Sequence, residues 1–148
     1  RRGGCSPASV SSKMNPEFLL YTDGAARGNP GPAGAGALIL ASDGAVVSEI
    51  SEFCGNTTNN VAEYRALLAG LKRLVAIGAQ EVSIFADSEL MVRQIKGIYR
   101  VKHPNLIPLF QEATVLLKKI PKYSITHILR ERNKEADRLA NRAIDEHF

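Results

Sequence analysis

The segment EFLLYTD (residues 17–23) is an apolar run that ends in a carboxylate, Asp23. Its aromatic and aliphatic side chains predict a buried β-strand. The run Val82–Ala86 has the same character and is closed by Asp87. Because a helical pattern separates the two runs, we expect parallel strands whose carboxyl ends meet at one edge of a sheet. Neighbouring strands lie about 4.8 Å apart, so the two carboxylates could share a metal ion.

The remaining patterns predict an α/β domain with a five-stranded mixed sheet, in which three antiparallel strands are followed by two parallel ones, flanked by helices. An Asp-Gly pair at residues 43–44 predicts a β-hairpin, and the glycines and prolines of residues 24–32 predict a loop. The expected strands cover residues 17–22, 34–41, 46–53, 81–86 and 123–129. Helices are expected after a polar loop at residues 55–60, at residues 89–96 and 106–120, and after a basic loop at residues 130–133.

Two further acids belong to these helices. Glu63 lies beside the apolar stripe of the first helix, and Asp137 lies near the start of the last one. Taken singly, each of the four acids has a structural explanation, as a helix cap, a partner of a helix dipole or the start of a turn. Brought together, they would repel one another unless a cation neutralised them. Mg²⁺ prefers oxygen ligands, so the set predicts a metal-dependent site.

Length and composition favour one domain with a real core, because the chain has 148 residues and 45% of them are hydrophobic. The net charge is +4, but three basic residues and no acid precede Asn15, which leaves +1 for the rest. Overall charge is therefore weak evidence for nucleic-acid binding.

Residues 1–16 are rich in Ser, Gly and Pro, so we expect a flexible tail or linker remnant before a domain at residues 17–148.

The expected location is the cytoplasm. The two cysteines, Cys5 and Cys54, form no disulfide framework, which favours free thiols in a reducing compartment. No apolar stretch approaches the roughly 20 residues of a membrane-spanning helix. The first residues carry charge without an apolar signal region, so we expect a soluble intracellular protein with no membrane partner.

Several other chemistries are disfavoured. The glycine-rich segment at residues 24–32 has no Gly-Lys-Ser/Thr ending and leads into a strand, which argues against a P-loop. His103, His127 and His147 have no metal-ligand spacing, and His127 is expected inside the fifth strand. No Ser, His and Asp set has the context of a covalent hydrolase.

Four ordered motifs resemble those of the ribonuclease HI family. They are YTDGAARGNPG (residues 21–31), TTNNVAEYRAL (residues 57–67), ADSELMVRQI (residues 86–95) and NKEADRLA (residues 133–140). The motifs occur in the expected order, and the resemblance extends over about residues 17–146. The resemblance implies a ribonuclease H-like fold and an endonuclease that cuts the RNA strand of RNA–DNA hybrids.

The resemblance also implies a metal-dependent mechanism. Asp23, Glu63, Asp87 and Asp137 would be the catalytic residues and the ligands of two Mg²⁺ or Mn²⁺ ions. Such a pair can activate water and stabilise the leaving oxygen. The products would carry a 5′-phosphate and a 3′-hydroxyl.

Substrate contacts are implied at two motifs. Asn59 and Asn60, with the backbone near Gly24, Ala25, Arg27 and Asn29, would read the minor groove and the 2′-hydroxyls that distinguish RNA. Thr58 would hold a phosphate of the DNA strand. An alternative reading is that Asn59 or Asn60 only caps the helix that follows.

Two departures from the family pattern indicate an abbreviated form. Residues 97–105 are short and contain no Trp, where other members carry a basic protrusion, and residues 129–133 contain no His, where others carry a catalytic one. Arg130 or Arg132 could instead position phosphate or aid product release. This form resembles archaeal and some bacterial and plant members.

Alternatives remain at this stage. One is a catalytically weak module of the same fold that binds hybrids or double-stranded RNA, and another is an integrase or transposase. Double-stranded RNA also stays open as a second substrate of the nuclease.

Overall fold

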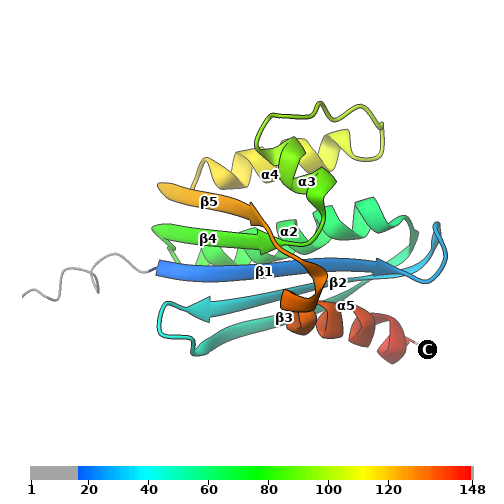
Figure 1. The fold of residues 1–148 in the computed structure, drawn as a ribbon, viewed down its shortest axis with the longest axis horizontal. Coiled ribbons are helices and arrows are strands. Elements are labelled where there is room, and N and C mark those ends of the chain that lie inside the picture. The colour runs from blue at the N-terminus through cyan, green and yellow to red at the C-terminus, as the bar shows by residue number, and fades with distance from the viewer. Residues whose placement is uncertain (1–16, 148) are drawn as a thin grey trace, which may run out of the picture.

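The computed structural model describes residues 17–147, which form one five-stranded sheet with helices on both faces (Figure 1). The expected tail at residues 1–16 lies outside the described residues. The strand order is β3-β2-β1-β4-β5; β1 pairs antiparallel with β2 and parallel with β4. The strands are β1 (Glu17–Ala26), β2 (Gly31–Ala41), β3 (Val46–Thr57), β4 (Glu81–Ala86) and β5 (Lys122–His127).

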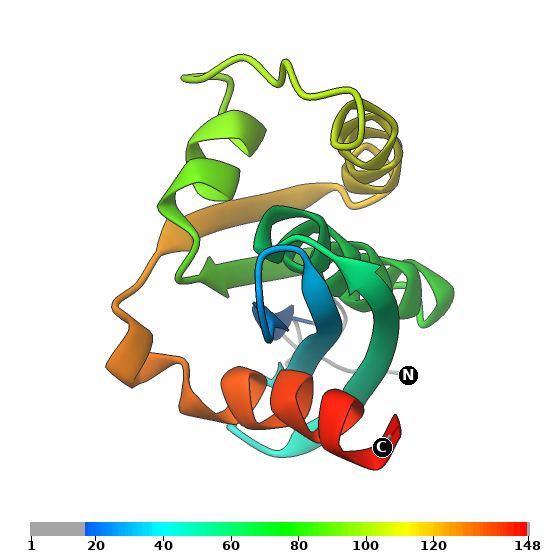
Figure 2. The same ribbon diagram turned by 90° about the vertical axis from the view of Figure 1, so that its right-hand side faces the viewer.

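The helices form two layers. In the view along the strands in Figure 2, α5 lies on one side of the sheet, and α2 with α4 lies on the other. The helices are α2 (Asn59–Ala76), α3 (Glu89–Ile95), α4 (Ile107–Leu117) and α5 (Lys134–His147), with a 3₁₀ turn, η2 (Arg130–Arg132). Within the described range every helix is too short or too polar to span a lipid bilayer.

Alternation along β2 separates the two layers. Ala37 and Ile39 are fully buried in the core beneath α2, whereas a side chain at Gly36 would meet α5. A Cβ at Gly36 would lie 2.2 Å from the Ala136 carbonyl oxygen. Successive strand residues point to opposite faces, so Ala37 and Ile39 face α2 while Gly36, between Ala35 and Ala37, faces α5. The close packing of α5 against the sheet therefore depends on glycine at position 36.

The sheet confirms the predicted architecture, because β1, β4 and β5 are parallel and the first three strands are antiparallel. His127 belongs to β5, as expected, although the strand ends at this residue rather than at residue 129. The hairpin at residues 43–44 is also present, with Gly44 at φ +93° and the Asp43 side chain accepting a hydrogen bond from Ala45 N.

The predicted loop at residues 24–32 is wrong over most of its length. β1 continues to Ala26 and β2 begins at Gly31, with Gly24 paired with Ala35. Gly24 serves for close approach of α2 rather than to break the strand, and the turn is confined to residues 27–30, where Gly28 has φ +100°. The polar loop at residues 55–60 likewise shrinks, because β3 runs to Thr57 and α2 begins at Asn59.

Replacing Gly36 with Ala should destabilise the protein by overpacking the contact between β2 and α5. We expect a loss of roughly 1–3 kcal/mol in the free energy of unfolding, measured by urea denaturation. Gly44→Asn is the matched control, since nothing lies within 4 Å of a Cβ there and Asn tolerates positive φ. Equal stability of Gly36→Ala and the wild type would contradict this packing argument.

Candidate active site

Three carboxylates from three elements meet at one edge of the sheet. Asp23 comes from β1, Glu63 from α2, and Asp87 follows the last residue of β4. One oxygen of each lies within 4.8 Å of the others. Asp23 is 2% exposed and Glu63 8% exposed. The structure therefore brings together three of the four acids that the sequence singled out.

Gly24 allows this meeting across the two faces of the sheet. Asp23 pairs with Gly36, whose open side faces α5, so the Asp23 side chain points to that face. Gly24 faces α2, and a Cβ there would lie 2.3 Å from Glu63 N. Without a side chain at Gly24, α2 comes close enough for Glu63 to reach Asp23 around the strand.

Asn133 fixes the position of Asp87 relative to the neighbouring strand β1. This residue is 1% exposed, and its Nδ2 donates to the Thr22 carbonyl oxygen at 2.8 Å and to Asp87 Oδ2 at 3.2 Å. One amide thus joins Thr22 within β1, the residue after β4 and the start of α5.

Asp137 lies beside the three acids rather than among them. Asp137 adds to the rise in the pKa of Asp23, so the two carboxyl groups are near each other, but Asp137 is not part of the 4.8 Å set. Asn141 Nδ2 donates to both the carbonyl oxygen and Oδ1 of Asp137, at 3.0 and 3.2 Å. The cluster is therefore asymmetric, with a compact triad and a fourth carboxylate to one side.

Burial and mutual repulsion favour protonation of the cluster. Burial raises the pKa of Asp23 far above its ordinary 3.8, and the charges of Glu63 and Asp87 raise it further. Burial also raises the pKa of Glu63 from its ordinary 4.5, and Asp87 adds to the rise while the charge of Arg130 opposes it. The cluster needs protons or a cation to be stable.

The donor set fits a hard divalent cation. Asp23 Oδ2 and Glu63 Oε1 are buried, and no donor in residues 17–147 reaches either oxygen. Buried carboxylate oxygens without partners are costly in a folded protein. Oxygen ligands carrying negative charge are those that Mg²⁺ and Mn²⁺ prefer.

An open groove of about 570 Å³ gives access to the cluster. The backbone of Gly24 to Arg27 forms one side, and exposed Asn59 and Asn60 stand at the start of α2. Arg130 and Ser88 complete the rim around Glu63, Asp87 and Asp137. The groove is therefore wide, polar and able to admit an extended ligand.

Other predicted contact residues lie outside the lining of this groove. Thr58 is the N-cap of α2, where its Oγ1 accepts from Val61 N at 3.3 Å. The cap is thus neither Asn59 nor Asn60, the alternative that the sequence left open. Asn29 Oδ1 accepts a hydrogen bond from Asn59 N at 3.1 Å, so Asn29 fixes the backbone at the start of the Asn59–Asn60 pair.

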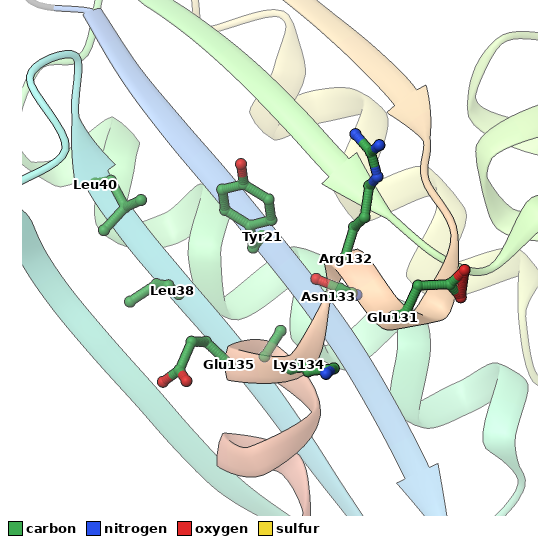
Figure 3. Close-up of a pocket in the computed structure, with 9 residues that line it drawn as sticks. Tyr21, Leu38, Leu40, Glu131, Arg132, Asn133, Lys134 and Glu135 are labelled. Atoms are coloured by element: carbon green, nitrogen blue, oxygen red, sulfur yellow. The ribbon is translucent and has the colours of Figure 1, made fainter.

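Arg132 lies at a different cavity from Arg130. The second cavity, of about 260 Å³, is formed by Arg132 with Tyr21, Leu38 and Leu40 on the α5 side of the sheet (Figure 3). Both arginines belong to η2, a 3₁₀ turn with about three residues per turn, so residues two apart point in different directions. The sequence grouped the two residues, and the turn separates them.

Sequence reasoning missed Asn133 and Asn141. Asn133 opens the fourth motif and lies in the predicted basic loop, where no role of its own was predicted for it. Asn141 is four residues after Asp137, which places both on one face of α5. That spacing was the signal available for Asn141.

Comparison with known proteins agrees with this geometry. A family model described as "Reverse transcriptase-like" matches residues 21–143. Ribonuclease HI of Halobacterium salinarum is 37% identical over 147 residues, covering 97% of this chain and 74% of that protein. The bifunctional protein Rv2228c of Mycobacterium tuberculosis is 44% identical over 130 residues, and the chain spans 36% of its length.

Solved structures give the same result. The N-terminal RNase H domain of Rv2228c superimposes with a TM-score of 0.85 at 44% identity, over 87% of this chain and 99% of that chain. LC11-RNase H1, solved in complex with an RNA/DNA hybrid, gives 0.83 at 44% identity, over 88% and 98%. The fold is that of ribonuclease H domains. Within that class, the chain belongs to the ribonuclease HI family.

Without metal, the protein should lose stability as the pH rises. The folded pKa values of Asp23 and Glu63 are raised, so this stabilisation is complete below their ordinary 3.8 and 4.5 and is lost as pH rises toward the folded values. Bound Mg²⁺ replaces the protons, so the gain in Tm on adding Mg²⁺ should grow from about pH 5 to about pH 8. Thermal unfolding with EDTA or Mg²⁺ measures this.

Asp23→Asn should remove most of the pH dependence of the stability of the metal-free protein. We expect the metal-free variant to be more stable than the wild type at about pH 8 by roughly 1–2 kcal/mol, because a buried repulsion is relieved. Glu112→Gln, in an exposed ion pair with Lys72, is the control and should follow the wild type. A wild-type Tm that is flat with pH and indifferent to Mg²⁺ would contradict the argument.

Proposed function

We propose that this protein is a divalent-metal-dependent endonuclease that hydrolyses the RNA strand of RNA–DNA hybrids. The observation that supports this most directly is the carboxylate triad of Asp23, Glu63 and Asp87, in which Glu63 and Asp87 line an open, polar groove and Asp23 is buried beside them. The family of the chain and the relative solved with an RNA/DNA hybrid support the same substrate.

The four acids would hold the ions. Asp23, Glu63 and Asp87 would bind one Mg²⁺ or Mn²⁺, and Asp137 with Asp23 would bind a second. When bound, the pair supplies water activation and stabilisation of charge on the scissile phosphate and the leaving oxygen. The products would be a 5′-phosphate and a 3′-hydroxyl. Asn133 would keep Asp87 oriented through its 3.2 Å hydrogen bond.

Asn59 and Asn60 would select the RNA strand. Their side chains are exposed at the rim of the groove. Because Thr58 caps α2, neither asparagine side chain is needed to cap the helix. Amides can donate to and accept from a 2′-hydroxyl, which DNA lacks. The adjacent backbone of Gly24 and Ala25 permits close approach of the strand.

Arg130 would contact a phosphate. It is exposed, lines the groove and opposes the rise in the pKa of Glu63, so its guanidinium lies near the acids. Residues 128–137 contain no His, and a fixed cation beside the cluster would help to position phosphate in its place.

The direct test is cleavage of matched labelled substrates. With Mg²⁺ or Mn²⁺ we expect cuts in the RNA strand of the hybrid, no cuts in double-stranded DNA, and none with EDTA. Asp87→Asn should lower kcat by at least about 10³-fold, because it removes a metal ligand while leaving the fold intact. Hybrid binding without cleavage by the wild type would favour the binding-module alternative. A double-stranded RNA arm shows whether that duplex is also a substrate.

The asparagine pair has a separate expected signature. Asn60→Ala should raise KM for the hybrid by about tenfold, the factor that corresponds to a lost hydrogen bond of about 1.4 kcal/mol, with a smaller effect on kcat. Gln111→Ala on α4, away from the groove, is the control and should leave both constants unchanged. Unchanged kinetics in Asn60→Ala and Asn59→Ala would remove this pair from the substrate site.

A further inference from the structure

A polar stripe runs along one face of α5 from the acidic cluster. Asp137, Asn141 and Asp145 are spaced four residues apart, so successive turns place them on one side of the helix. Arg27, just beyond the end of β1, reaches this stripe. Its guanidinium is 2.8 Å from Asp145 Oδ1 and 3.3 Å from Asn141 Oδ1.

The contacts fix the orientation of the Asn141 amide. Its Nδ2 donates to the Asp137 carboxylate and carbonyl oxygen, while its Oδ1 accepts from Arg27. The opposite orientation would set oxygen against carboxylate and NH₂ against guanidinium. Both ends of the amide therefore select the same rotamer, and that rotamer points a donor at Asp137.

Asp137 is the acid that needs such support. The three other acids lie within 4.8 Å of one another, whereas Asp137 stands to one side, half-buried on a helix edge beside Asp23. Asn141 lines the same groove and supplies a side-chain donor to the Asp137 carboxylate.

We propose that Asn141 is a positioning residue that holds the Asp137 carboxylate for the more weakly bound of two metal ions, and that Arg27 orients Asn141. This inference rests on the proposed function, since it concerns the ion pair of that site. It assigns Arg27 a role at the metal site through its side chain, separate from any contact that its backbone makes with substrate. The ion within the triad of Asp23, Glu63 and Asp87 does not depend on either residue.

The first measurement is Mn²⁺ binding without substrate, by calorimetry and electron paramagnetic resonance. Asn141→Ala should weaken the second ion by about 10- to 100-fold, the range for hydrogen-bond partners of metal ligands, and leave the first within about twofold. Ala is a strong helix former and Asn141 is half-exposed, so the variant should fold. Arg27→Met should shift the second ion in the same direction by a smaller factor.

The second measurement is the Mg²⁺ dependence of hybrid cleavage. The Mg²⁺ concentration for half-maximal kcat should rise in Asn141→Ala by a factor similar to the loss of affinity, and high Mg²⁺ should restore most of kcat. A merely structural role would lower kcat at every Mg²⁺ concentration. Glu146→Gln, an exposed change on the same helix, is the matched control and should match the wild type in both assays.

The outcomes separate the two proposals. Two bound ions and hybrid cleavage in the wild type, with unchanged ion binding and Mg²⁺ dependence in Asn141→Ala, would overturn this inference alone. A wild-type protein that binds no Mn²⁺ and cleaves no hybrid would overturn the proposed function, and this inference with it.

Discussion

The repulsion among buried carboxylates is the constraint on which the site depends. Asp23, Glu63 and Asp87 place oxygens within 4.8 Å of one another, and two of these residues are almost wholly buried. Such a cluster opposes folding unless protons or a cation neutralise it. The surrounding fold must therefore supply enough stability to hold the acids together, and the packed core between the sheet and α2 supplies it.

Glycine lets the two layers of the fold contribute to one site. Gly24 opens space for α2 beside β1, and Gly36 opens space for α5 on β2. Glu63 therefore arrives from one face of the sheet, and Asp137 from the other. Asn133 then joins the start of α5 to Thr22 of β1 and to Asp87 after β4. Backbone approach, rather than long side chains, brings the acids into range.

Much of the fold was readable because its signals are local. The apolar runs ending at Asp23 and Asp87 and the helical pattern between them define parallel neighbours, and the structure has them. The segment at residues 24–32 was misread because a glycine that permits helix packing looks the same in sequence as one that makes a turn. That distinction depends on a partner, α2, which local pattern does not contain.

The acids of the site could be predicted from the sequence, but the residues that support them could not. Acids at the ends of apolar runs can be placed from topology, which is how Asp23 and Asp87 were brought together. Asp87 does follow the end of β4, whereas β1 continues past Asp23 to Ala26. Asn133 supports Asp87, which is 46 positions away in the sequence, and only the three-dimensional contact gives it that role. Asn141 supports Asp137 from four positions away, so the helical spacing was a signal, but the spacing alone does not show the hydrogen bond. Arg130 and Arg132 look equivalent in sequence, yet the 3₁₀ turn sends them to separate cavities.

The most direct test of the central claim is anomalous diffraction from crystals of this protein grown with Mn²⁺. The account predicts anomalous peaks at the floor of the groove, one among the oxygens of Asp23, Glu63 and Asp87 and another between Asp23 and Asp137. Manganese bound only elsewhere on the molecule, with these carboxylates protonated and in contact with one another, would contradict it.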